Sequence, residues 1–204
     1  MLDSVARKII DPPLNRAAHI LSGLRLTGTF TTLTGFLFGV VACGFVYNQL
    51  YIAGLAFLIL NRLCDGLDGA IARARNEDSD FGGYLDITLD FFMYAGFPFA
   101  FALGLNTIDA FMASSFVIFA MITTGVSFLA YAIIAAKNNM QTSHQGKKSF
   151  YFSNGLMEGT ETILFLCLLC IFPYDFAMIC FIFGGLCLVT TIMRIRMAYC
   201  NFVQ

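Results

Sequence analysis

The sequence has few charged residues, and the charges it has are nearly balanced. Charged residues make up 12% of the 204-residue chain, whereas soluble domains carry about 25%. The formal net charge is −1, so the chain lacks the basic excess of nucleic-acid-binding proteins, and we expect no nucleic-acid partner. The hydrophobic content of 58% and the mean hydropathy of +0.77 favour a membrane protein instead.

Linkers and repeats are also missing, and we expect no secretory leader. No Gly-rich or Ser-rich stretch divides the chain, and no segment repeats, so we expect one domain over residues 1–204. Residues 1–20 lack the apolar core that a signal peptide needs. They alternate apolar and charged residues around Pro12-Pro13, which predicts an interfacial amphipathic helix over residues 1–22. An ordinary surface helix fits this pattern equally well.

A disulfide framework is not indicated, although the chain has seven cysteines. Most of them lie in apolar runs. Cys167 and Cys170 form a CxxC, a spacing that can mark a metal or redox site. Their setting, LFLCLLCIF, is apolar and offers no histidine or second CxxC. Packing inside a membrane helix is therefore the favoured interpretation.

Against this background, one polar stretch is conspicuous. Residues 65–90 hold four aspartates between two apolar runs: Asp65, Asp68, Asp86 and Asp90. The first pair is three residues apart and the second four apart, so each pair shares a helix face. Carboxylates next to membrane segments are costly to bury and indicate function. Two helix ends converging with four hard oxygen donors would bind Mg²⁺ or Mn²⁺. The alternative to a metal site is that the acidic residues are solvated in a loop. That alternative describes Glu77, Asp78 and Asp80 better.

The remaining chain predicts an all-α fold. Six apolar segments are each near the length of about 20 residues that crosses a bilayer. We place them at residues 29–47, 50–73, 82–104, 109–136, 156–173 and 175–195. The predicted architecture is a polytopic membrane protein with six transmembrane helices, bundled over residues 29–195.

Lysine and arginine are distributed asymmetrically around these segments. Eleven of them fall on the side of the N-terminus, beyond the spans or close to their ends: Arg7, Lys8, Arg16, Arg25, Arg73, Arg75, Lys137, Lys147, Lys148, Arg194 and Arg196. Arg62 lies within a span. The short turns on the opposite side contain none. The positive-inside rule then predicts that both termini and the aspartates are cytoplasmic.

The aspartate stretch resembles the signature of the CDP-alcohol phosphotransferase (CDP-alcohol phosphatidyltransferase, class I) family, D-x2-D-G-x2-A-R-x8-G-x3-D-x3-D. All eight fixed positions match: Asp65, Asp68, Gly69, Ala72, Arg73, Gly82, Asp86 and Asp90. The chain length and hydrophobic profile also resemble the family's six-helix membrane domain. The segments LNRLCDGLDG and GKKSFYF resemble those of a bacterial inner-membrane subgroup.

This resemblance implies a phospholipid-biosynthetic transferase. Such an enzyme moves a phosphatidyl group from CDP-diacylglycerol to an alcohol and releases CMP. The resemblance implies two Mg²⁺ or Mn²⁺ ions at the four aspartates, with Asp90 also acting as general base. It further implies a homodimer in the inner membrane. The implied nucleotide-binding residues are Asp65, Gly69, Ala72, Arg73 and Thr32.

Some of these assignments have alternatives. Relatives carry Pro-Asn followed by Thr near Thr32, where this chain has Gly28-Thr29, and this weakens the assignment of Thr32. From spacing alone, Gly69 and Ala72 fit close helix packing as well as nucleotide contact. Glu158 and Glu161 either stabilise the start of a helix or face the same polar cavity.

The acceptor lies outside the shared signature. Four cations make a phosphorylated acceptor plausible, with glycerol 3-phosphate as the leading candidate: Lys147, Lys148, Arg194 and Arg196. Inositol, inositol phosphate and serine are the alternatives, and Lys147-Lys148 also fits plain positive-inside charge. A cation transporter with intramembrane aspartates is the competing class, and a non-catalytic membrane scaffold is the third. Neither explains why Gly, Ala and Arg recur at the phosphotransferase spacing.

Overall fold

The computed structural model describes residues 12–14, 16, 18, 27–75, 77, 79–138 and 155–203. Within these residues every regular element is a helix, which confirms the all-α class. In chain order they are α2 (Gly28–Tyr47), α3 (Tyr51–Arg75), α4 (Asp80–Leu105), α5 (Ile108–Lys137), α6 (Gly159–Ile171), the short 3-10 helix η1 (Pro173–Asp175) and α7 (Phe176–Phe202).

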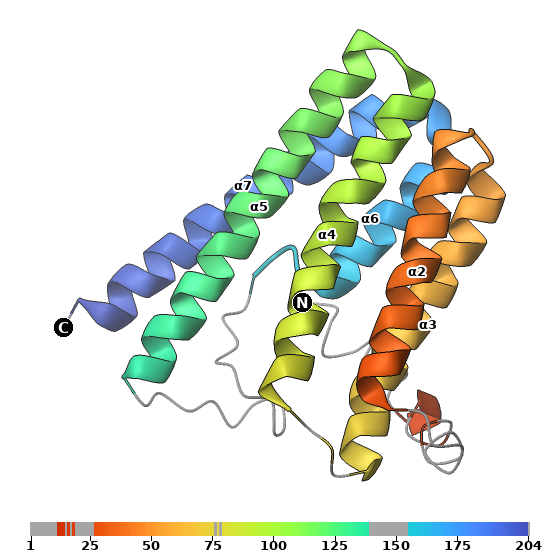
Figure 1. The fold of residues 1–204 in the computed structure, drawn as a ribbon. Coiled ribbons are helices and arrows are strands. Elements are labelled where there is room, and N and C mark those ends of the chain that lie inside the picture. The colour runs from red at the N-terminus through yellow and green to blue at the C-terminus, as the bar shows by residue number, and fades with distance from the viewer. Residues whose placement is uncertain are drawn as a thin grey trace.

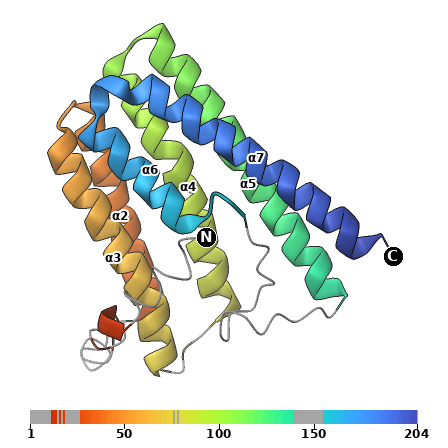
Figure 2. The same ribbon diagram turned by 180° about the vertical axis from the view of Figure 1, so that it is seen from behind.

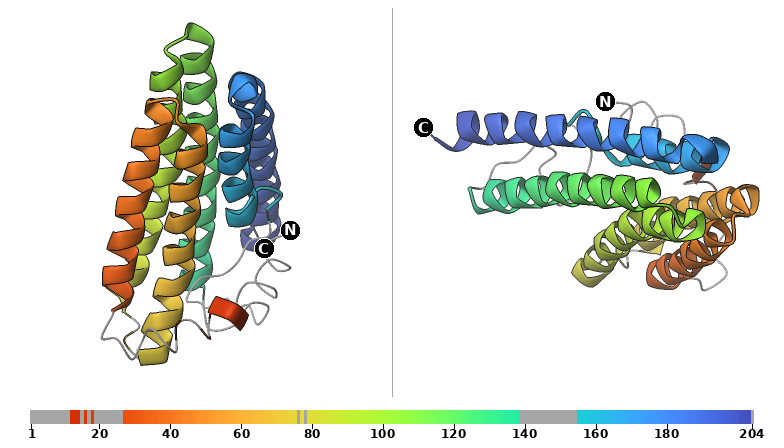
Figure 3. Two further views of the ribbon diagram at one scale, coloured as in Figure 1. Left: turned by 90° about the vertical axis from the view of Figure 1, so that its right-hand side faces the viewer. Right: turned by 90° about the horizontal axis from the view of Figure 1, so that it is seen from above.

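The helices form two groups, which contact each other through α4 and α5 and through α3 and α6. Helices α2, α3 and α4 pack together, and α5 packs mainly on α7 (Figure 1). Seen from behind, α6 lies against the first group and beside α7 (Figure 2). Viewed from above, α6 and α7 share one layer, and α5 lies between α7 and the α2–α4 group (Figure 3). Toward the end that holds residues 65–90 the two groups diverge (Figure 1).

Tight turns close the opposite end of the bundle. Gln49, after α2, donates its side-chain amide to the Gly104 carbonyl at the end of α4, at 2.7 Å. Asn106 caps α4 in the left-handed conformation with φ 50°, which asparagine tolerates better than most residues. Thr107 then caps α5 by accepting from the Ala110 amide at 3.2 Å. These short connections keep consecutive helices antiparallel and adjacent.

A face of small residues lets α2 approach α3 closely. The buried positions of α2 recur every three or four residues, as one helix face requires: Gly28, Thr31, Gly35, Gly39, Ala42 and Val46. A Cβ atom on Gly35 would lie only 2.7 Å from the Cβ of Cys64 on α3. Small residues at helix interfaces are typical of membrane proteins, where backbone proximity drives packing.

Four of the helices in the described part of the chain are long and apolar enough to cross a membrane: α2, α4, α5, and η1 with α7. Helix α3 is long enough but carries the charged half of the motif. Helix α6 has 13 residues and spans about 20 Å, less than the ~30 Å hydrocarbon core. The predicted length of that span, 156–173, was therefore wrong, because a capping box at Glu158 and Pro173 limit the helix. The membrane class is confirmed, and the count of six spans stays a prediction.

The predicted N-terminal helix over residues 1–22 falls mostly outside the described residues. Residues 12–14, 16 and 18 are helical. Ala18 is buried with Ala70 and Ile71 of α3, so this segment packs against the helix that carries the aspartate motif. Cys170 is buried and Cys167 half-buried, both as free thiols, in agreement with a packing role.

Candidate active site

Helices α3 and α4 bring three carboxylates to one point. Asp65 comes from α3, and Asp86 and Asp90 come from consecutive turns of α4. Each offers an oxygen atom, and the three atoms lie within 4.8 Å of one another. Three carboxylates this close repel each other unless a cation lies among them.

The geometry of this cluster fits a small divalent ion. Opposite oxygens around Mg²⁺ are about 4.2 Å apart at its usual bond length, close to the spacing here. All four motif aspartates, including Asp68, line one narrow hollow of about 10 Å³ between α2, α3 and α4. A space of this size accommodates a single ion or water molecule. Carboxylate oxygens are also the ligands that Mg²⁺ and Mn²⁺ prefer.

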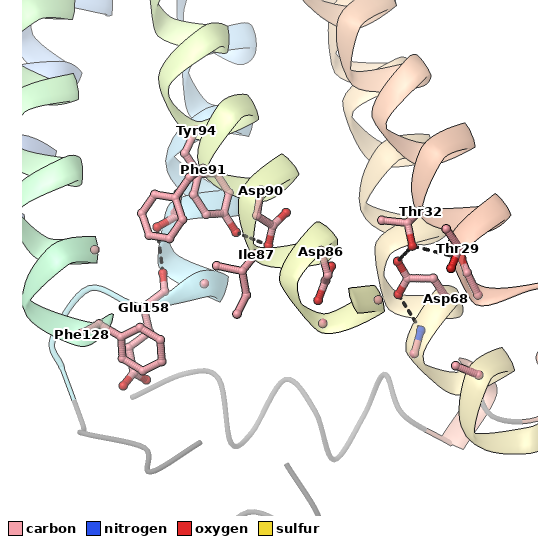
Figure 4. A pocket seen from close by; sticks show the side chains of 18 of the residues that line it. Thr29, Thr32, Asp68, Asp86, Ile87, Asp90, Phe91, Tyr94, Phe128 and Glu158 are labelled. Carbon is pink, nitrogen blue, oxygen red and sulfur yellow. Dashed lines mark hydrogen bonds between the residues drawn. The ribbon is translucent and has the colours of Figure 1, made fainter. Parts of the chain in front are cut away.

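Asp68 lies beside the cluster rather than within it. Its carboxylate accepts a hydrogen bond of 2.6 Å from the Thr32 hydroxyl on α2 and one of 2.5 Å from the Gly69 amide (Figure 4). Its side chain is buried, with 5% of the residue exposed. The family resemblance implied that all four aspartates bind metal, with Asp90 also acting as general base. The structure gathers three and holds the fourth against α2.

Arg62 enters the cluster, which the sequence analysis did not predict. Its NH1 atom lies 2.8 Å from an Asp90 oxygen and 3.6 Å from an Asp65 oxygen. Its three-residue spacing from Asp65 was a signal available in the sequence, because residues at i and i+3 share a helix face. The contact with Asp90 depends on the crossing of α3 and α4, which sequence spacing does not reveal.

A cavity of about 530 Å³ opens next to the aspartates, between the two helix groups. One wall carries most of the motif: Asp68, Gly69, Ala72, Arg73, Gly82, Asp86 and Asp90. Thr32 also lines it, despite the departure from the family pattern nearby. Figure 4 shows Asp86 and Asp90 on α4, with Asp68 and Thr32 to one side and Phe128 and Glu158 across from them.

The small residues of this wall serve two purposes. A Cβ on Gly28 would lie 3.0 Å from the Ala72 Cβ, so Ala72 packs against α2 as well as lining the cavity. A Cβ on Gly69 would lie 3.1 Å from the Arg73 guanidinium, so Gly69 leaves room for that side chain over the helix. Gly69 and Ala72 can therefore serve both helix packing and contact with a nucleotide.

The opposite wall contains one of the predicted acceptor cations. Arg194 on α7 lines the cavity and is buried, donating to the Thr124 carbonyl at 3.0 Å. Its guanidinium lies 5.4 Å from the Phe128 ring centre. Arg196 is exposed on the same helix, away from the cavity lining. Lys147 and Lys148 lie outside the described residues.

The glutamates at the start of α6 were expected either to stabilise that helix or to face the cavity, and the structure shows both arrangements. Glu158 and Glu161 form a capping box, in which the Glu158 amide donates to the Glu161 carboxylate at 3.2 Å. Glu158 lines the cavity as well. Glu77, predicted to be a solvated loop residue, is exposed and pairs with Arg75 at 2.9 Å, yet it also borders the cavity.

Comparison with known proteins places this arrangement in a family. The sequence profile described as CDP-alcohol phosphatidyltransferase matches residues 18–198. The chain is 46% identical over 199 residues to the inner membrane protein YnjF of Escherichia coli (strain K12), covering 98% of this chain and 96% of that protein. It is 38% identical over 104 residues to the archaetidylinositol phosphate synthase of Pyrococcus horikoshii, covering 51% of this chain and 55% of that protein.

A solved structure shares the fold. The phosphatidylinositol phosphate synthase of Mycobacterium tuberculosis, crystallised with CDP-DAG bound, superimposes with a TM-score of 0.73 at 16% identity, covering 91% of this chain and 93% of that chain. A second structure of that enzyme, in complex with manganese and citrate, gives a TM-score of 0.70 at 18% identity over 91% and 88% of the two chains. From the profile match and the end-to-end similarity to the Escherichia coli protein, the chain belongs to the CDP-alcohol phosphatidyltransferase family and is a transferase of phosphatidyl groups.

Proposed function

We propose that the protein transfers a phosphatidyl group from CDP-diacylglycerol to an alcohol acceptor and releases CMP, as a step of phospholipid synthesis. The observation that carries this proposal is the convergence of Asp65, Asp86 and Asp90 within 4.8 Å at the edge of a cavity lined by Gly69 and Arg73. The Mycobacterium tuberculosis enzyme of the same fold, crystallised with CDP-DAG, supports this choice of donor. Cation transport and scaffolding, the competing interpretations, lose their support once the family is established.

The aspartates would hold divalent metal, Mg²⁺ or Mn²⁺, and two such ions would neutralise a diphosphate and orient it for attack. The structure of that relative with manganese supports a metal of this class. Asp65, Asp86 and Asp90, whose oxygens lie within 4.8 Å of one another, would be the main ligands. Asp68, held by Thr32 and the Gly69 amide, would complete the site from the α2 side.

The transfer itself is a substitution at phosphorus. The acceptor hydroxyl attacks the phosphorus next to the diacylglycerol, the bond between that phosphorus and the bridging oxygen breaks, and CMP leaves with the bonding electrons. Asp90 accepts the proton of the attacking hydroxyl as general base. Gly69, Ala72 and Arg73 hold the cytidine and its diphosphate, because they line the cavity wall beside the aspartates. The Arg73 guanidinium suits a phosphate oxygen.

Arg194 supports a phosphorylated acceptor. Only 5% of this arginine is exposed, and its Nε has no hydrogen-bond partner among the described residues. The positive charge of a largely buried guanidinium at a cavity wall is well suited to attract an anion. Glycerol 3-phosphate is our first choice. Lys147, Lys148 and Arg196 remain candidates for the acceptor site on the sequence alone.

Inositol phosphate is the second candidate acceptor. The Pyrococcus horikoshii and Mycobacterium tuberculosis relatives are named as synthases of inositol phosphate lipids. Inositol and serine are further alternatives, which leave the Arg194 donor without a phosphate partner.

The setting of the reaction follows from the charge asymmetry. We place the protein in the inner membrane as one domain over residues 1–204, with six spans, an N-terminal interfacial helix, and the site and both termini cytoplasmic. The acyl chains then stay in the bilayer while the diphosphate reaches the cavity. A homodimer follows from the family resemblance.

CMP release tests this function. The purified protein would be given CDP-diacylglycerol, Mn²⁺ or Mg²⁺, and a panel of acceptors: glycerol 3-phosphate, inositol phosphate, inositol and serine. We expect CMP only when both a divalent ion and a phosphorylated acceptor are present. Arg194→Gln should raise the KM for that acceptor more than it lowers kcat. Metal-independent CMP release, or none with any acceptor, would refute the proposal.

A further inference from the structure

The guanidinium of Arg194 packs against the backbone of the segment that leads into α6. Gly155, in that segment, is buried. A Cβ atom at Gly155 would lie 2.8 Å from Arg194 NH2 and 3.2 Å from the central guanidinium carbon. Glycine allows such a close approach because it has no side chain. The reaction outlined above assigns this contact no part.

Thr190 joins the same segment to α7. It lies one turn before Arg194, on the same face of the helix, and it is fully buried. Its hydroxyl donates to the Leu186 carbonyl at 2.9 Å and accepts from the Met157 amide at 3.0 Å. The second bond joins residues that are 33 positions apart in the chain. Thr190 therefore fixes the segment 155–157 against α7.

Helix α5 holds the same guanidinium. Arg194 NH1 donates to the Thr124 carbonyl at 3.0 Å, and the guanidinium carbon lies 5.4 Å from the centre of the Phe128 ring. The guanidinium thus contacts α5 and the segment before α6 as well as its own helix. A long side chain that is already held in place loses less conformational entropy when it binds a ligand.

The position of the segment before α6 also bears on a second charge at this wall of the cavity. The Gly155 amide donates to the Glu158 carboxylate at 2.9 Å. Met157, Glu158 and Arg194 all line the cavity, whereas Thr190 is not among its lining residues. A shift of the segment would therefore change the wall where we place the acceptor and leave the aspartate wall in place.

We propose that Thr190 is a positioning residue for the acceptor. By holding the Met157 amide, it keeps Gly155 against the Arg194 guanidinium and so fixes where that charge meets the phosphate of the acceptor. Thr190 acts through Arg194 and does not touch the acceptor itself. The inference rests on the acceptor binding proposed above.

Steady-state CMP release by the full-length protein in detergent tests it, with glycerol 3-phosphate or inositol phosphate as the acceptor. Thr190→Val keeps the branched shape but removes the hydroxyl and leaves a backbone amide unpaired. The KM for the acceptor should rise about fivefold or more. The kcat and the KM for CDP-diacylglycerol should stay within about twofold of wild type, because the loss affects acceptor binding. Thr190→Ser keeps the hydroxyl and should resemble wild type.

Thr123→Val is the matched control. The Thr123 hydroxyl on α5 donates to the Phe119 carbonyl at 2.8 Å, the same bond within a helix that Thr190 makes to Leu186. Its removal should leave the KM for the acceptor unchanged. A loss equal to that of Thr190→Val would show that any helix threonine has this effect, and it would overturn the inference.

A double variant tests whether Thr190 acts through the arginine. In the Arg194→Gln background, Thr190→Val should raise the KM for the acceptor no further, because residues that act through one group are not additive. A further rise of about fivefold would show an independent effect and overturn the inference. Gly155→Ala covers the case in which Thr190→Val fails to fold, since its methyl group displaces the guanidinium and should also raise the KM for the acceptor.

The remaining outcomes separate this inference from the proposed function. An acceptor KM within about twofold of wild type in folded Thr190→Val or Gly155→Ala would overturn the inference and leave the proposed function intact. CMP release only with inositol or serine would overturn it too, since these acceptors carry no phosphate for Arg194. Wild-type protein that releases no CMP with any acceptor would refute the proposed function and this inference with it.

Discussion

Thr32 and Asp68 are joined across two helices by a hydrogen bond of 2.6 Å from the threonine hydroxyl to the carboxylate. The residues are 36 positions apart in the chain. The bond holds the Asp68 carboxylate against α2, beside the point where Asp65, Asp86 and Asp90 meet. Thr32 therefore fixes the orientation of the Asp68 side chain on α3.

Replacing Thr32 tests this control of Asp68. Thr32→Val keeps the branched shape but removes the donor, whereas Thr32→Ser keeps the hydroxyl. Because hydrogen bonds to charged groups contribute about 1.5–3 kcal/mol, we expect turnover of Thr32→Val to fall about tenfold or more. Thr32→Ser should retain most activity. Similar CMP release by the two variants would show that the bond has no role in catalysis.

The carboxylate cluster predicts unequal metal losses. Asp65→Asn and Asp86→Asn each replace an anionic ligand by a neutral one, so Mn²⁺ affinity and turnover should fall together. Asp68→Asn should weaken Mn²⁺ binding less, because Asp68 lies beside the cluster, even though its activity falls. Asp109→Asn is the control, since that exposed residue begins α5 at the opposite end. A loss at Asp109 similar to that at Asp65 would mean that the site is misplaced.

The general-base assignment predicts a separation of rate from binding. A general base contributes about 10²–10⁴-fold to rate, so Asp90→Asn should lose turnover by that range while CDP-diacylglycerol still binds. Both quantities would be measured on the same purified variant, with Asp80→Asn, exposed in the first turn of α4, as the control. Affinity that falls in step with rate would make Asp90 a ligand only. The base would then be sought among other carboxylates, starting with Glu158.

Reporter fusions test the orientation in the membrane. A reporter active only outside the cytoplasm should be active when fused after Asn48 or Leu105 and inactive after Asn138. The first two positions lie at the same end of the bundle, where Gln49 bonds to Gly104. Opposite results for Asn48 and Leu105 would contradict both the charge rule and the fold.

The contact between α2 and α3 predicts a stability effect at one glycine. Gly35→Ala would place a methyl group 2.7 Å from the Cβ of Cys64, and overpacking of this kind typically costs about 1–3 kcal/mol. The thermal midpoint in detergent should drop for Gly35→Ala and remain near wild type for Gly44→Ala, because the added methyl at Gly44 meets no atom within 4 Å. Equal midpoints would show that the helices separate to accept the methyl.

The sequence alone determined the class of the protein and predicted which aspartates belong to its site. Apolar runs predicted where the long helices lie, although the length predicted for α6 was wrong. Charge was scarce enough to indicate a membrane. Spacing along one helix is a local property, so the motif predicted that Asp65 shares a face with Asp68, and Asp86 with Asp90.

Only the tertiary structure decided which of these side chains meet. The crossing of α3 and α4 brings Asp65 to Asp86 and Asp90, while the close approach of α2 draws Asp68 to Thr32. Arg62 joins the cluster and Arg194 faces it from across the cavity for the same reason. Contacts between helices depend on crossing angles and on the combined packing of many residues, and no local period in the sequence records them.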